Sequence, residues 1–158
     1  DIRTKIVCAP SLIERAMVTL ASNRALLLVG EPGTAKSLLS ELLAAAISGT
    51  STLTVQGSAA TTEDQIKYGW NYALLINEGP SPRALMPAPL YRGMRDGHVV
   101  RFEEITRAPL EVQDCLLGML SDRVMAVPEL EGEHGMLVRA MAQRCFRLVT
   151  RRDVRGDG

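Results

Sequence analysis

The feature that most constrains the fold is a short apolar run that ends in a glycine-bearing loop and continues into a strongly helical segment. Residues 25–30 read ALLLVG, residues 30–37 read GEPGTAKS, and residues 36–48 read KSLLSELLAAAIS. A short continuous apolar run is typical of a strand buried on both faces, as in a parallel sheet. The Leu- and Ala-rich segment favours a helix that Gly49 can end. A strand, a tight loop and a helix in this order indicate a layered α/β structure.

The loop nearly matches a phosphate-binding pattern of Gly, four residues, Gly, Lys, and Ser or Thr. Gly30, Lys36 and Ser37 fit this pattern, and Ala35 occupies the position of the second glycine. In such a loop, Gly30 and Gly33 let the backbone N–H groups approach phosphates without a Cβ in the way. Lys36 would reach the β- and γ-phosphates, and the Ser37 hydroxyl would bind Mg²⁺. Ala35 is compatible with this loop if its φ is negative. The alternative is a glycine-rich turn that caps an ordinary helix.

A second acidic element lies at the end of another expected strand, HVVRFEE at 98–104. Ligands of open α/β sheets bind at the carboxyl ends of the strands, and Glu103 and Glu104 stand at such an end. By position, Glu103 would support Mg²⁺ or its waters, and Glu104 would polarise a water that attacks the γ-phosphate. Glu103 is one methylene longer than the usual Asp. The alternative is that both glutamates form a solvated strand end.

The remaining segments alternate between helical and strand-like patterns, which predicts a parallel sheet covered by helices on both faces. Ser11 and Glu14 form an expected capping box for the first helix, and Pro109 suits the first turn of a later one. Gly69 weakens the helical pattern in which it lies. The expected elements are a helix at 11–22, a strand at 52–56, a mainly helical segment at 62–79, a loop at 77–89, a helix at 108–122, a hairpin at 123–141 and a strand at 144–150.

Composition excludes several classes of function. The net charge is zero and the pI is about 6.9, so no basic excess indicates nucleic-acid binding. No apolar run approaches the length of a membrane span, and the first residues lack the layout of a signal peptide. Cys8, Cys115 and Cys145 are widely spaced, which argues against a zinc site or a disulfide framework. We therefore expect a cytoplasmic protein with reduced thiols and with neither a nucleic-acid nor a membrane partner.

Taken together, these motifs resemble the MoxR branch of AAA+ ATPases. GEPGTAKS is similar to the Walker A loop of that branch, in which Ala before Lys is common. The segment VVRFEEITRAPLEVQDCLLGMLSDRVMAVPE is similar to its Walker B strand with the following Arg-Ala-Pro segment, helix and hairpin. TEDQIKYGWNYALL resembles the region where this branch carries extra elements. The resemblance extends over roughly residues 5 to 150.

The resemblance implies a three-layer α/β/α P-loop NTPase core that binds ATP and Mg²⁺, with a mostly parallel sheet ordered 5-1-4-3-2 and a β-hairpin insertion. It also implies a chaperone-like remodelling ATPase that works as a ring, usually a hexamer, and commonly serves a partner with a von Willebrand factor A domain. Glu104 matches the catalytic glutamate, Ser37 and Glu103 match the metal site, and Arg107 matches the Arg that follows Walker B. The residues matching the nucleotide contacts are Gly30, Glu31, Pro32, Gly33, Thr34, Ala35, Lys36, Ser37 and Leu38.

The sequence departs from the family pattern after FRLV. An Asn that positions water usually follows there, whereas this chain continues TRRDVRGDG, and Asp153 falls near the Asn position. We expect an AAA+ core at 1–150 that lacks a fifth strand and a helical lid, and a loose tail at 151–158. Two alternatives stay open, a module that binds nucleotide without turnover and a small-molecule P-loop kinase. The adjacent glutamates after a strand favour hydrolysis over kinase chemistry.

Overall fold

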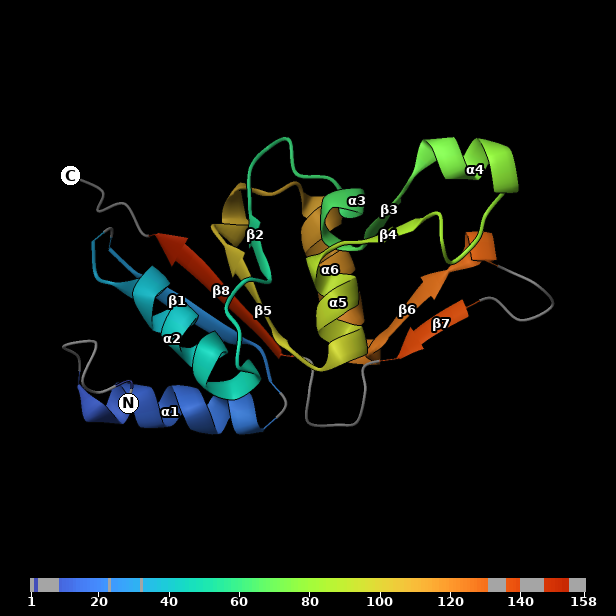
Figure 1. Ribbon diagram of the computed structural model, residues 1–158. Helices are drawn as coiled ribbons and strands as arrows, with labels where there is room; N and C mark the ends of the chain where they lie inside the picture. The colour runs from blue at the N-terminus through green and yellow to red at the C-terminus, as the bar shows by residue number, and fades with distance from the viewer. Residues whose placement is uncertain are drawn as a thin grey trace.

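The computed structural model describes residues 2, 9–22, 24–31 and 33–130, together with the backbone of 136–139 and 147–153 (Figure 1). Its helices and strands alternate over most of the chain. In order they are α1 (Pro10–Ala21), β1 (Leu26–Gly30), α2 (Lys36–Ser48), β2 (Thr54–Gln56), α3 (Glu63–Ile66), β3 (Tyr68–Trp70), α4 (Tyr72–Glu78), β4 (Leu85–Pro87), α5 (Pro89–Asp96), β5 (Val99–Glu103), the 3-10 turn η2 (Ile105–Arg107), α6 (Leu110–Asp122), β6 (Val124–Val127), the 3-10 turn η3 (Pro128–Leu130), β7 (Met136–Arg139) and β8 (Arg147–Asp153).

A parallel sheet forms the centre of the fold. In the described residues it has four strands in the order β1-β8-β5-β2. Every neighbouring pair in this sheet is parallel. Numbered by the core strands alone, the order is 1-4-3-2, which agrees with the expected sequence of strands as far as the described residues extend. Because the strands are parallel, their carboxyl ends lie at one edge, which is where an α/β sheet binds ligands.

Helices cover both faces of the sheet, so the expected three-layer α/β/α core is confirmed. Figure 1 shows α1 and α2 to one side of the sheet and α3, α5 and α6 to the other. Side chains of β5 alternate between the two layers, because successive residues of a strand point to opposite faces. Val99 belongs to the core cluster formed with α1 and α2, whereas Val100 and Phe102 belong to the larger cluster formed with α5 and α6.

Two small antiparallel sheets stand beside the core. β6 pairs with β7, which confirms the hairpin expected at 123–141 for the strands that the structure describes. β3 pairs with β4 between Tyr68 and Pro87. The short helix α4 carries no buried residue and stands apart from the layers in Figure 1. In the described part of the chain, no helix has the length and apolar character needed to cross a membrane.

Several expected elements differ from the observed ones. The segment 62–79 is not mainly helical, because β3 interrupts it and pairs with β4. The loop expected at 77–89 already contains β4, and α5 begins at its end. α1 begins after Ala9 with Pro10 in its first turn, so Ser11 lies inside the helix and caps nothing. Pro109 is the residue before α6 rather than part of its first turn.

The expected end of the ordered core is also wrong in part. β8 continues through Arg151, Arg152 and Asp153, since these residues pair in register with β1. Residues 154–158 of the expected loose tail lie outside the described residues, as do residues 144–146 of the last expected strand.

Candidate nucleotide site

The loop after β1 has the backbone that a phosphate-binding loop requires. Gly33 has a φ of +81°, which is open to glycine without strain. A Cβ added to Gly30 would lie 3.4 Å from Thr34 Oγ1 and 3.6 Å from Lys36 Cδ, which are ordinary contacts, so packing alone does not require glycine there. No side chain caps the start of α2, and a helix N-terminus of this kind favours anions. Pro32 lies outside the described residues.

Ala35 contradicts the expectation of a negative φ. Its φ is +56° and its ψ is +22°, which is left-handed backbone. The reason is geometric, because the chain must reverse between the loop and the first turn of α2, and Leu39 N–H already donates to the Ala35 carbonyl at 3.0 Å. The position therefore keeps a glycine-like conformation although it carries a methyl group.

Lys36 is buried and folds back over the loop. Its Nζ donates to Thr34 Oγ1 at 2.9 Å and to the Glu31 carbonyl oxygen. Thr34 Oγ1 in turn donates to the same carbonyl at 2.8 Å. The ammonium group thus lies over the loop, where its bonds include two to neutral oxygens. A phosphate oxygen can replace these acceptors, since a charged acceptor forms the stronger bond.

Glu103 lies at the carboxyl end of β5, and its side chain is only 7% exposed. The buried Ser40 hydroxyl, from α2, is 3.1 Å from Glu103 Oε1. Ser40 follows Ser37 by three residues, so both lie on one face of the helix, roughly 5 Å apart. The structure therefore brings Glu103 to α2 at Ser40, one turn after Ser37, and the two-residue metal site at Ser37 and Glu103 stays a prediction.

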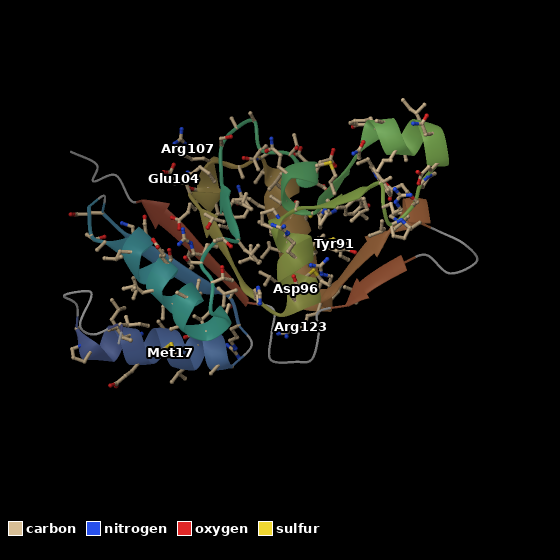
Figure 2. The ribbon with its side chains drawn as sticks, in the orientation of Figure 1. Met17, Tyr91, Asp96, Glu104, Arg107 and Arg123 are labelled. Carbon is tan, nitrogen blue, oxygen red and sulfur yellow. The ribbon has the colours of Figure 1, made fainter. Side chains whose placement is uncertain are left out.

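Glu104 and Arg107 form a pair just beyond β5. Arg107 Nη1 donates to Glu104 Oε2 at 2.7 Å, and Figure 2 shows the two side chains next to each other. Glu104 has a φ of +52°, which turns the chain sharply into η2. Gly57 packs under this turn, and a Cβ there would lie 2.5 Å from the Glu104 carbonyl oxygen. The end of β2 is thus fitted closely to the turn that carries the expected catalytic glutamate.

Sequence reasoning missed Ser40 and Arg101 at this site. Arg101 Nε lies 3.7 Å from Glu103 Oε1, and Arg101 Nη1 lies 3.9 Å from Glu41 Oε2. The one signal in the sequence was a charged residue inside an otherwise apolar strand, VVRF.

Two other residues singled out from the sequence lie near the loop. The strand register places the backbone of Asp153 opposite Gly30, at the start of the phosphate loop. Leu38 lies in the first turn of α2, where its side chain is exposed.

Comparison with known proteins agrees with this geometry. The family model of the AAA domain (dynein-related subfamily) matches residues 25–155. Over all 158 residues the chain is 67% identical to a protein of Escherichia coli (strain K12) described as uncharacterized protein YehL, and it spans 43% of the length of that relative.

Two solved structures share the fold. A candidate ATPase from Cytophaga hutchinsonii ATCC 33406 has a TM-score of 0.62 at 18% identity, over 99% of this chain and 42% of that one. The complex between subunits BchI and BchD of magnesium chelatase has a TM-score of 0.63 at 19% identity, over 92% of this chain and 53% of that one.

Proposed function

This chain belongs to the dynein-related subfamily of AAA domains, and on that premise we propose that it binds ATP with Mg²⁺ and hydrolyses the nucleotide. One observation carries the proposal, the bond between Ser40 of α2 and Glu103 of β5. It joins the helix that follows the phosphate loop to the acidic end of a neighbouring strand. A phosphate-binding loop and an acidic group that meet at one sheet edge are the parts that nucleoside triphosphate hydrolysis requires.

The residues present fit a bound Mg²⁺ ion. A serine hydroxyl and a buried carboxylate are hard oxygen donors, which Mg²⁺ prefers. Glu103 contacts α2 at Ser40, one turn after Ser37. When bound, Mg²⁺ would neutralise charge on the phosphate oxygens. Lys36 would exchange the Glu31 carbonyl for a phosphate oxygen, and the backbone of residues 30–38 would surround the phosphates.

Glu104 is the proposed base. One of its carboxylate oxygens accepts from Arg107, and the carboxylate is the group that would orient the attacking water. The left-handed turn at Glu104 directs the residue away from the strand axis, at the edge of the sheet where the loop after β1 also lies.

The proposed branch of AAA+ ATPases, the oligomeric state and the partner rest on the similarity of sequence motifs. We propose a MoxR-type chaperone or remodelling ATPase that works as a hexamer with a partner carrying a von Willebrand factor A domain. GEPGTAKS, the FEEITRAP segment and the β6–β7 hairpin that follows α6 support this proposal. A cytoplasmic location is supported by the free, half-buried thiol of Cys115, whereas Cys8 and Cys145 lie outside the described residues.

One observation favours a second candidate, a module that binds nucleotide without turnover. The Glu104 carboxylate is already engaged by the Arg107 guanidinium group at 2.7 Å, an ion pair that competes with the contact to an attacking water. In that case the chain would bind ATP and release no phosphate.

The proposal is tested by calorimetric titration of the chain with ATP and Mg²⁺. Lys36→Ala removes a charge-assisted contact worth about 1.5–3 kcal/mol, so we expect affinity to fall by at least about tenfold. Lys67→Ala is the matched control, because Lys67 pairs with Glu63 elsewhere in the fold and should leave ATP affinity unchanged. Equal affinities of Lys36→Ala and the unmodified chain would refute the site.

Phosphate release separates the two candidate functions. If Glu104 is the base, Glu104→Gln retains ATP binding and lowers release by about 10²-fold or more. Tight binding with no release by the unmodified chain would instead favour the module without turnover.

A further inference from the structure

Arg101 occupies an unusual place for a charged side chain. It lies in the middle of β5, a strand whose flanking side chains Val100 and Phe102 are fully buried, and its own side chain is only 12% exposed. Since successive side chains of a strand alternate, Arg101 points to the same face as Glu103, toward α2. Its Nε makes no hydrogen bond within the described part of the chain. A buried guanidinium is costly unless a charge partner compensates it.

Two carboxylates lie near this guanidinium. Glu103 Oε1 is 3.7 Å from Nε and belongs to the proposed metal site, with a side chain almost fully buried. Glu41 Oε2 is 3.9 Å from Nη1 and lies on α2, with a side chain that is 55% exposed. Both distances are longer than a good hydrogen bond, so the guanidinium is not fixed on either partner.

We propose that Arg101 is a positioning residue that sets the Mg²⁺ dependence of nucleotide binding. Without a divalent cation, its guanidinium neutralises Glu103. When Mg²⁺ engages Glu103 or the waters around it, Arg101 shifts its interaction to Glu41. This inference rests on the proposed function, because it requires Mg²⁺ and nucleotide to bind at this site.

The physical reason is competition between like charges. A cation that approaches Glu103 meets the positive charge of Arg101 in a poorly solvated environment, where Coulomb repulsion is strong. Moving Arg101 toward the exposed Glu41 relieves that repulsion. This role also agrees with a glutamate, and not an aspartate, at position 103. The longer side chain of Glu103 extends from the end of β5 to Ser40 of α2.

The test measures the Mg²⁺ concentration that gives half-maximal binding of a fluorescent ADP analogue, so no turnover is involved. Arg101→Met keeps much of the side-chain bulk and removes the charge, and we expect this concentration to fall about tenfold. Arg101→Lys keeps the charge and should stay within about twofold of the unmodified chain. Glu41→Gln removes the second carboxylate and should raise the concentration by about twofold, a small effect because Glu41 is exposed.

Controls separate this inference from the proposed function. Glu111→Gln neutralises another exposed glutamate, in the first turn of α6, and should change nothing. An unmodified chain that binds no nucleotide at any Mg²⁺ concentration overturns both proposals. If the unmodified chain binds nucleotide in a Mg²⁺-dependent way and the half-maximal Mg²⁺ concentration of Arg101→Met is equal or higher, only the role of Arg101 is overturned. If thermal unfolding shows that Arg101→Met does not fold, the test uses Arg101→Lys instead. A tenfold change in the half-maximal Mg²⁺ concentration of folded Arg101→Lys would then overturn the role of Arg101.

Discussion

At the residue scale, the proposed site depends on left-handed backbone at positions that are not glycine. Ala35 and Glu104 have φ values of +56° and +52°. A left-handed residue with a Cβ costs about 1–2 kcal/mol, and such strain persists only where surrounding structure enforces it. Here α2 begins directly after Ala35, and η2 begins directly after Glu104. The strain therefore lies in the two turns that would surround a bound nucleotide.

We predict that Ala35→Gly stabilises the fold. Glycine removes a penalty of about 1–2 kcal/mol for left-handed backbone with a Cβ. It also destabilises the fold by about 0.4–1 kcal/mol, because the unfolded chain gains conformational entropy. The expected net gain in unfolding free energy is about 0.5–1 kcal/mol, measured by urea denaturation. Ala44→Gly, in the middle of α2, is the control and should lose about 1 kcal/mol or more. Loss of stability in Ala35→Gly would show that the left-handed turn carries no penalty.

The strand, loop and helix that form the expected phosphate loop could be predicted from sequence because the motif depends on local spacing, and the roles of its residues stay a prediction. Ser40 and Arg101 could not be predicted in this way. The Ser40–Glu103 bond joins residues that are 63 positions apart, and it exists only because α2 packs along β5. A serine three residues after Ser37 is unremarkable until that packing is known.

At the scale of single elements, the sequence predicted best where one pattern was undisturbed. α2 has the predicted bounds, since Leu and Ala fill it and Gly49 ends it in a left-handed conformation. The prediction of a mainly helical segment at 62–79 was wrong, because β3 (Tyr68–Trp70) pairs with β4 instead of continuing a helix. The sequence analysis did not predict α5, although the sequence marks both ends of this helix. Pro89 lies in its first turn, and Gly97 is its C-cap.

A side-chain hydrogen bond joins β3 to the region after β6. Tyr68 Oη donates to Glu129 Oε2 at 3.0 Å, from β3 to the 3-10 turn η3. Burial, and then the bond to Glu129, raises the pKa of Tyr68 from 10.0 to about 12. The folded state therefore favours the neutral phenol. Its contribution to stability is complete below pH 10.0 and is lost as the pH rises through about 12.

We predict that Tyr68→Phe lowers the unfolding free energy by about 1 kcal/mol at neutral pH, the typical value of such a hydrogen bond. The difference from the unmodified chain should shrink as the pH rises above about 10. Urea denaturation at increasing pH measures both effects. Tyr72→Phe is the control, since Tyr72 is an exposed residue of α4 and should have no effect at any pH. A difference that does not change with pH would exclude the Glu129 bond as its cause.

At the scale of the whole molecule, the two faces of the sheet are covered unequally. α1 and α2 cover one face at β1, and Leu28 is buried there. Leu27 and Val29 point to the other face and are 53% and 55% exposed. Within the described residues β1 also has a single neighbour, β8. β1 thus combines an unpaired edge with an apolar face, a combination that favours pairing with another chain.

We predict that the purified chain self-associates through β1 in the absence of nucleotide, and that Leu27→Lys suppresses this association. A lysine on an edge strand places a charge where a second strand would pack, which is a common way for proteins to block edge pairing. Light scattering coupled to size exclusion should give a mass above 17.2 kDa for the unmodified chain at high concentration, and a mass close to it for the variant. Val18→Lys, at an exposed apolar position of α1, adds the same charge away from β1 and should associate as the unmodified chain does. If both lysine variants reduced association equally, net charge and not the β1 edge would be the cause.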